Sequence, residues 1–76
     1  MNAASDVEFK LSNNLLAYRR ARRLKQIELA KSVGVTRQAI IAVEKGRINP
    51  SIKLCLKIAL VLQVPINELF YLEPLE

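Results

Sequence analysis

The sequence predicts an all-α fold of five short helices that includes a helix-turn-helix, with a short β-strand added near each end. Three observations predict this fold. Apolar residues recur at helical spacing through the middle of the chain. A glycine separates two short amphipathic segments within residues 26–45. Short apolar stretches suited to strands lie near the two ends, at 7–11 and 70–72.

The chain is long enough for one small domain. It has 76 residues, of which 51% are hydrophobic, so a packed core can form although the surface it buries is limited. Residues 1–6 are small and polar, and we expect them to form a disordered tail. Residues 7–76 would form the domain, and apolar and charged side chains alternate over 7–11 as they do in a strand.

The first helix is predicted to run from about Asn14, a favourable N-cap residue, to Arg22. At helical spacing, Leu15 and Tyr18 face the core together with either Ala21 or Arg22. This helix therefore buries one stripe of side chains and leaves most of its arginines for another use.

Two further helices at 26–32 and 37–44 are predicted to form the helix-turn-helix. Helices that cross at roughly 90–120° need a small side chain at their contact, and Ala30 provides it. Gly34 is placed where the first helix must stop, because the left-handed conformation of such a stop suits glycine. Thr36 is a preferred N-cap residue before the second helix. Apolar residues seal one face: Leu29, Val33, Val35, Ile40 and Val43.

In a helix-turn-helix the second helix can enter the major groove of DNA. The alternative is an ordinary helical hairpin within a bundle. A hairpin does not require the small residue, the glycine and the apolar positions to coincide as they do here, so the pattern favours DNA binding.

A fourth helix is predicted at 52–62, with Gly46 ending the helix before it and either Asn49 or Ser51 as its N-cap. The fourth helix is apolar on nearly all sides, which indicates burial on most sides. In so small a domain this excess suggests that part of the helix, Leu60 especially, meets another subunit.

The C-terminal part is predicted to form a fifth short helix and a strand. Pro65 suits the start of a helix at 66–69, because its missing N–H is not needed there. Residues 70–72 form the second predicted strand, and Pro74 ends it.

Positive charge is concentrated in the body of the chain. The net charge is +5, yet all 12 Lys and Arg lie within residues 9–67, where Glu28 and Glu44 are the only acids. A polyanion is the simplest partner for such a basic body, and a merely solvated basic face is the alternative. Together with the helix-turn-helix, the charge indicates double-stranded DNA. RNA is a poorer fit, because aromatic residues are only 5% of the chain and no stacking platform is visible.

The composition argues against an enzyme and against a metal or other cofactor. The chain has no His, and its acids do not cluster within the basic body. Its single Cys55 shares a predicted helical face with Ile52, Ile58 and Ala59, as a small core residue would. No basic segment precedes an apolar signal stretch, and no apolar run approaches about 18 residues. We therefore expect a cytoplasmic protein without membrane contact.

A longer set of residues carries a resemblance to a known family. These residues are Leu15, Arg19, Gln26, Leu29, Ala30, Gly34–Gln38, Ile40, Glu44–Arg47, Asn49–Ser51, Leu56–Ala59 and Asn67–Phe70. With them, the span from 14 to 72 resembles the Cro/cI-type (lambda-repressor-like, XRE family) helix-turn-helix regulators, especially the short stand-alone form. It is also similar to the cytolysin-operon repressor type, in which an N-terminal strand pairs with a C-terminal strand and helps to build a homodimer.

The resemblance implies a homodimeric repressor that reads a near-palindromic operator, and it implies a role for particular residues. Arg37, Gln38, Ile41 and Ala42 are implied to contact bases, and geometry favours Arg with guanine and Gln with adenine. Phosphate contacts are implied for Gln26, Thr36, Lys45, Arg47 and Asn49, with Arg23 added by its place in an arginine run. Arg19 and Glu44 match a structural salt bridge. The expected dimer interface comprises Leu60, Leu69, Phe70, Tyr71 and Leu72.

The chain departs from the family pattern at several positions. Lys25 replaces the usual Ser or Thr before the second helix, and its side chain cannot accept a capping hydrogen bond. Arg23 replaces a frequent glycine, so it must adopt a costlier conformation or let the helix end differently. Ile41 and Ala42 cannot donate to bases, and they either touch thymine methyl groups or, for Ile41, pack on the domain.

The alternative function is an antitoxin-type module that neutralises a protein and also binds DNA. Such a protein usually has an added toxin-binding segment. The six residues at each end of this chain leave little room for one.

Overall fold

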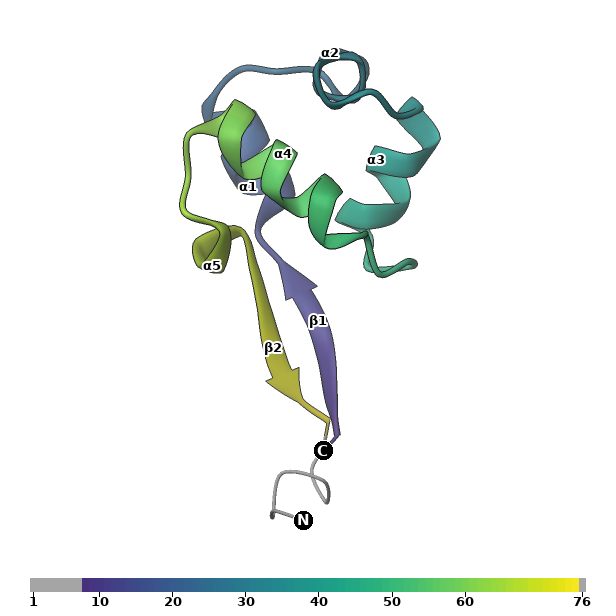
Figure 1. The fold of residues 1–76 in the computed structure, drawn as a ribbon, viewed down its shortest axis with the longest axis vertical. Helices are drawn as coiled ribbons and strands as arrows, with labels where there is room; N and C mark the ends of the chain where they lie inside the picture. The colour runs from purple at the N-terminus through teal and green to yellow at the C-terminus, as the bar shows by residue number, and fades with distance from the viewer. Residues whose placement is uncertain (1–7, 76) are drawn as a thin grey trace.

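In the computed structural model, which describes residues 8–75, a two-stranded ribbon projects from a body of five helices (Figure 1). The elements in chain order are β1 (Phe9–Asn13), α1 (Leu15–Ala21), α2 (Gln26–Val33), α3 (Arg37–Glu44), α4 (Ile52–Leu62), α5 (Ile66–Leu69) and β2 (Phe70–Pro74). The predicted fold class, with its helix-turn-helix and its terminal strand pair, is confirmed. The predicted tail at 1–6 and Val7 of the first predicted strand lie outside the described residues.

The helix-turn-helix is built from the residues that suit its turn. Gly34 ends α2 in the left-handed conformation, with φ of 76°, as only glycine does without strain. The Val35 N–H then donates to the Ala30 carbonyl at 3.0 Å. Thr36 caps α3, because its Oγ1 accepts from the Ala39 N–H at 3.1 Å. Ser51, rather than Asn49, caps α4 in the same way.

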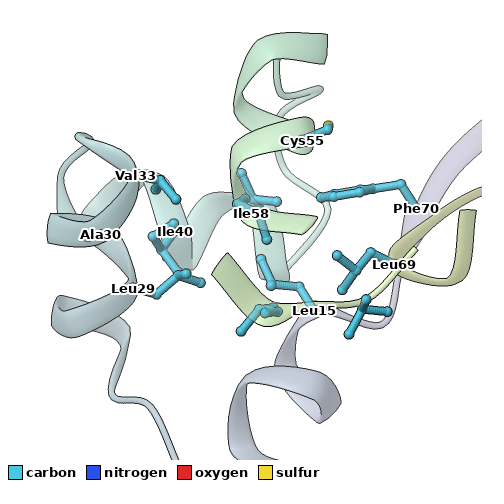
Figure 2. Close-up of a cluster of buried hydrophobic side chains, with 12 residues drawn as sticks. Leu15, Leu29, Ala30, Val33, Ile40, Cys55, Ile58, Leu69 and Phe70 are labelled. Atoms are coloured by element: carbon cyan, nitrogen blue, oxygen red, sulfur yellow. The ribbon is translucent and has the colours of Figure 1, made fainter. Parts of the chain in front are cut away.

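A single core joins the helices and the root of the ribbon. Its largest fully buried side chains are Leu15, Leu29, Val33, Ile40, Val43, Ile58, Leu62 and Leu69. In Figure 2 the ring of Phe70 lies toward Ile58 and Cys55, so the first residue of β2 belongs to the core. Burying each large apolar side chain contributes about 1.5–3 kcal/mol, so this cluster positions α2 and α3 on α4.

Two expectations about α1 are wrong in detail. Ala21 and Arg22 are both exposed, and Arg19 is the buried residue of the last turn. Its guanidinium can be buried because it is paired with a carboxylate, as described below. Asn14 occupies the N-cap position without a side-chain cap, and the Oδ1 of Asn13 accepts the Leu15 N–H instead, at 3.0 Å.

The helix α4 is less buried than its composition predicted. Ile52, Leu56 and Leu60 form one stripe along it at i, i+4 and i+8, and they are 69%, 53% and 78% exposed. Ile52 therefore does not share the buried face of Cys55, which is in the core as predicted. Only one side of α4 faces the core, and among residues 8–75 no other helix covers its exposed stripe.

One side of the ribbon is mainly apolar and the other side is polar. β1 and β2 are antiparallel, with Leu11 opposite Leu72 and Asn13 opposite Phe70. Because successive strand residues point to opposite faces, these side chains share one face with Phe9. The other face carries Lys10, Ser12, Tyr71 and Glu73, and there the Ser12 hydroxyl donates to Glu73 at 2.5 Å.

Candidate nucleic-acid interface

The outward face of α3 carries the four side chains expected to contact bases. Arg37 and Gln38 are exposed in its first turn, and Ile41 and Ala42 are half-buried one turn further along. The inward face of the same helix is fixed by Ile40 and Val43, which are buried. Packing therefore leaves the N-terminal half of α3 free to enter the major groove of DNA, as a recognition helix requires.

Four of the expected phosphate-binding residues surround α3. Thr36 precedes the helix, whereas Lys45, Arg47 and Asn49 follow it, and all four are exposed. Hydroxyl, amide and cationic side chains are the groups that bind phosphate oxygens. Their placement on both sides of the recognition helix suits contacts to the two backbones that border a major groove.

Arg23 lies apart from this set, in the turn between α1 and α2. It is exposed and has φ of 58°, which is the costlier left-handed conformation, the first of the two alternatives that the sequence left open. A neighbouring groove is lined by Arg20, Lys25 and Lys45 together with Gln26. The sequence analysis did not assign a role to Arg20 or Lys25, although the arginine run was the signal for a basic surface here.

A buried polar network holds α3 against α1 and α2. The Arg19 Nε lies 2.6 Å from the Glu44 Oε2, and the two side chains are only 9% and 5% exposed. The Arg19 Nη1 also donates to the Leu24 carbonyl at 2.7 Å. Because a buried ion pair is stable only with good geometry and further hydrogen bonds, this network restricts the orientation of the last turn of α3.

Gln26 is part of the same network. Its Nε2 donates to the Glu44 Oε1 at 3.0 Å. A carboxamide nitrogen has two hydrogens, so the second remains for a phosphate oxygen. Gln26 thus links the expected phosphate contact at the start of α2 to the end of the recognition helix.

The sequence analysis missed Asn13, which joins three elements. This last residue of β1 accepts the Leu15 N–H of α1 through its Oδ1, and its Nδ2 donates to the Val43 carbonyl of α3 at 2.9 Å. Two adjacent asparagines precede the helix, and the sequence does not distinguish which of them accepts the Leu15 N–H. No sequence pattern indicated the long-range bond to α3.

The expected dimer residues divide into exposed and buried groups. Leu60, Tyr71 and Leu72 are exposed, the last of them by 61%. Leu69 and Phe70 are buried in the core of their own chain, which corrects their assignment to a surface. Leu69 ends the short α5 and Phe70 follows it, and both side chains lie in the core rather than at the surface (Figure 2).

Two titratable groups have altered pKa values, and each has a local cause. Burial raises the pKa of the Cys55 thiol, which keeps it protonated and unreactive. A hydrogen bond to Glu68 raises the pKa of the Tyr18 hydroxyl, with smaller contributions from burial and from the carboxylate charge. Neither group belongs to the outward face of α3.

Among residues 8–75, no cluster of three or more potential metal ligands is present. Within the same span, every helix is too short or too polar to cross a bilayer.

An exposed α3 on a helix-turn-helix, flanked by polar and cationic side chains, defines the DNA-binding helix-turn-helix class of proteins. The HTH_3 family, described as Helix-turn-helix, matches residues 15–69. The chain belongs to this family, the Cro/cI (XRE) type of transcriptional regulator, and it is a DNA-binding regulator rather than an enzyme.

Relatives of this chain include regulators from an archaeon and a bacterium. The HTH-type transcriptional regulator MJ0272 of Methanocaldococcus jannaschii is 48% identical over 63 residues, which are 83% of this chain and 96% of that protein. The HTH-type transcriptional regulator YgzD of Bacillus subtilis is 44% identical over 48 residues, which are 63% of this chain and 73% of that protein.

Solved structures of similar fold support the same family. The restriction-modification controller protein C.AhdI from Aeromonas hydrophila has a TM-score of 0.67 and 35% identity, over 71% of this chain and 82% of that one. The transcriptional regulator VanUg has a TM-score of 0.72 and 25% identity, over 88% of this chain and 89% of that one.

Proposed function

We propose that this protein is a homodimeric repressor that reads a near-palindromic operator through the major groove. The observation that supports the proposal most is the exposed first turn of α3, with Arg37 and Gln38 held outward by the buried contacts of Ile40 and Val43. A dimer of the protein places two such helices on two half-sites that lie about one turn of the DNA double helix apart. A bound dimer would exclude the transcription machinery from the sites that it covers.

Base recognition is assigned to the outward face of α3. Arg37 can donate two hydrogen bonds to a guanine edge, and Gln38 can both donate to and accept from an adenine. The side chains of Ala42 and Ile41 have no polar atoms, so any base contact that they make is with thymine methyl groups. Specificity then depends on two polar side chains and on the shape of a small apolar patch.

Backbone contacts are assigned to residues on both sides of that face. Lys45, Arg47 and Arg23 contribute charge, while Thr36, Asn49 and Gln26 contribute uncharged hydrogen bonds. These contacts set the register of α3 on the duplex without reading sequence. The protein would act in the compartment that holds the DNA, which is the cytoplasm in the archaea and bacteria of its relatives.

A second copy of the chain is the proposed occupant of an exposed apolar face. This apolar face is defined by exposed side chains, which are Ile52, Leu56 and Leu60 on α4 and Phe9 and Leu72 on the ribbon. Monomeric proteins rarely leave contiguous apolar patches larger than a few hundred Å² uncovered. The strand pair also fits the plan of the cytolysin-operon repressor type, in which such strands help to build the dimer.

The test of DNA reading is selection of bound sites from random duplexes by the wild-type protein, followed by affinity measurements. We expect a palindromic site bound about 10³-fold or more above scrambled DNA. Gln38→Ala should lose preference at one base pair per half-site, whereas Asn67→Ala, which removes an exposed amide on α5, should not. Salt-sensitive binding without any preferred site would refute the proposal.

The test of the dimer is sedimentation equilibrium without DNA. Leu60→Glu places a charge in the apolar face and should shift the protein to monomer. Ile27→Glu makes the same exchange on α2, outside the apolar face, and should leave the dimer intact. If wild-type protein is monomeric at micromolar concentration, the apolar face binds another partner, as in the antitoxin alternative.

A further inference from the structure

A groove separates the ribbon from the end of the recognition helix and from the loop that follows it. Lys10 and Ser12 of β1 line one side, while Lys45, Gly46 and Asn49 line the other. Asn13, the last residue of β1, also lines this groove. Among residues 8–75, the bond from the Asn13 Nδ2 to the Val43 carbonyl is the one side-chain hydrogen bond between the ribbon and α3.

Both ends of this bond are fixed in the fold. Asn13 is opposite Phe70 in the ribbon, and Phe70 is buried in the core. The Val43 carbonyl lies in the last turn of α3 and also accepts the Gly46 N–H at 3.0 Å. A carbonyl oxygen has two lone pairs, so Asn13 completes the hydrogen bonding of a group that the helix end leaves partly unsatisfied.

We propose that Asn13 is a positioning residue, which fixes the angle of the recognition helix relative to the ribbon and thereby sets the half-site spacing that the dimer accepts. The proposal rests on the proposed function, because the ribbon carries part of the apolar face and α3 carries the base contacts. In a symmetric dimer, the separation of the two recognition helices depends on how rigidly each is joined to the interface.

The carboxamide of Asn13 has two separable tasks, and one substitution separates them. Asn13→Asp keeps an oxygen to accept the Leu15 N–H, and a negative charge suits the N-terminus of α1. It replaces the Nδ2 donor with a second carboxylate oxygen, which repels the Val43 carbonyl. The start of α1 is therefore kept while the link to α3 is lost.

Asn14→Asp is the matched control. The Nδ2 of Asn14 donates to the Glu68 carbonyl of α5 at 3.1 Å, so this variant loses a similar bond beside the same helix end. It adds the same charge one residue away, and it leaves α3 untouched. Any effect of charge on DNA affinity is thus shared by the two variants.

The DNA arm compares binding to the selected operator with binding to operators that have one base pair added or removed at the centre. Wild type and Asn14→Asp should prefer the selected spacing to the same degree. For Asn13→Asp we expect binding to the selected operator to weaken by about 3- to 30-fold, with a smaller loss at the altered spacings. A preference for spacing equal to that of Asn14→Asp would overturn the inference.

A second arm needs no DNA, and so it separates this inference from the proposed function. Amide hydrogen exchange should become faster at Gly46 and Arg47, which follow α3, in Asn13→Asp than in Asn14→Asp. Unchanged exchange there would overturn the inference even if the wild-type protein has no operator. If Asn13→Asp does not fold, Asn13→Ser serves instead, because its hydroxyl can accept from Leu15 but is too short to reach Val43.

Discussion

At the scale of single residues, Glu44 is the acid on which the recognition helix depends. It is one of two acids in the basic body, and it receives hydrogen bonds from Arg19 and from Gln26. One carboxylate thus joins α1, α2 and α3 at the point where α3 ends. The same carboxylate would repel phosphate if it were exposed, so its burial serves both stability and binding.

Removing Arg19 should therefore be costly. In Arg19→Met the Glu44 carboxylate stays buried with only Gln26 as a partner, and we expect the free energy of unfolding to fall by about 3–5 kcal/mol. Urea denaturation monitored by circular dichroism measures this loss. Arg20→Met, at the exposed neighbouring position, should change stability by less than about 0.5 kcal/mol. Equal losses of unfolding free energy in the two variants would show that the ion pair between Arg19 and Glu44 does not stabilise the fold.

Tyr18 should make the stability of the fold depend on pH in the alkaline range. Its hydroxyl donates to the Glu68 Oε1 at 3.1 Å, which raises the pKa of the phenol above the ordinary value of 10.0. The bond stabilises the fold fully below about pH 10 and is lost as the pH rises through the raised pKa. Tyr18→Phe should therefore be less stable than wild type at pH 8, by a margin that shrinks above pH 10. Urea midpoints at several pH values test this, and a constant margin would contradict it.

At the scale of elements, the N-terminus of α2 is incompletely capped. Lys25 has the extended backbone of an N-cap but no side-chain acceptor, and only the reciprocal bond is made, from the Lys25 N–H to the Glu28 carboxylate at 2.7 Å. Lys25→Thr should complete the capping box and raise the free energy of unfolding by on the order of 0.5–1 kcal/mol. Lys25→Val is the control, because valine has the same shape as threonine but has no hydroxyl. An equal gain from Val in urea denaturation would exclude capping as the cause.

The helices could be predicted from sequence because local chemistry determines their ends. Gly34, Thr36 and Ser51 are at the predicted stops and caps, and α4 and α5 begin and end at the predicted residues. Periodicity could not predict which apolar residues of α4 stay exposed. A stripe such as Ile52 and Leu60 has the same spacing whether a neighbouring element, a second copy or water covers it.

The candidate site was predictable where a residue acts through its own position on a helix. Arg37 and Gln38 are exposed in the first turn of α3 because the turn before it is well defined. Asn13 and Val43 could not be paired from sequence, because their bond joins segments 30 residues apart and follows no periodicity. The burial of Phe70 was missed because a strand pattern does not reveal how deep its first residue lies. Leu69 was missed because a helix of one turn is too short for periodicity to show which side faces the core.

At the scale of the whole molecule, the uneven distribution of charge should appear in the salt dependence of binding. Each lysine that contacts phosphate releases condensed counterions, and its removal lowers the slope of log affinity against log salt by about 1. In a dimer, Lys45→Ala should lower the magnitude of this slope by about 2, and it should weaken binding to all DNA sequences alike. Lys57→Ala, on α4 and outside the proposed contacts, should leave the slope unchanged. Fluorescence anisotropy across a salt series would reveal whether the two variants differ.

The ribbon also constrains the order in which the molecule can assemble. Its strands come from opposite ends of the described chain, and their pairing closes a loop that contains all five helices. Closing so long a loop has a high entropic cost, whereas α2 and α3 meet across a short turn. Pulse-labelled hydrogen exchange during refolding should therefore protect α3 before β1. A growing chain would therefore complete its helix-turn-helix before its two ends can meet in the ribbon.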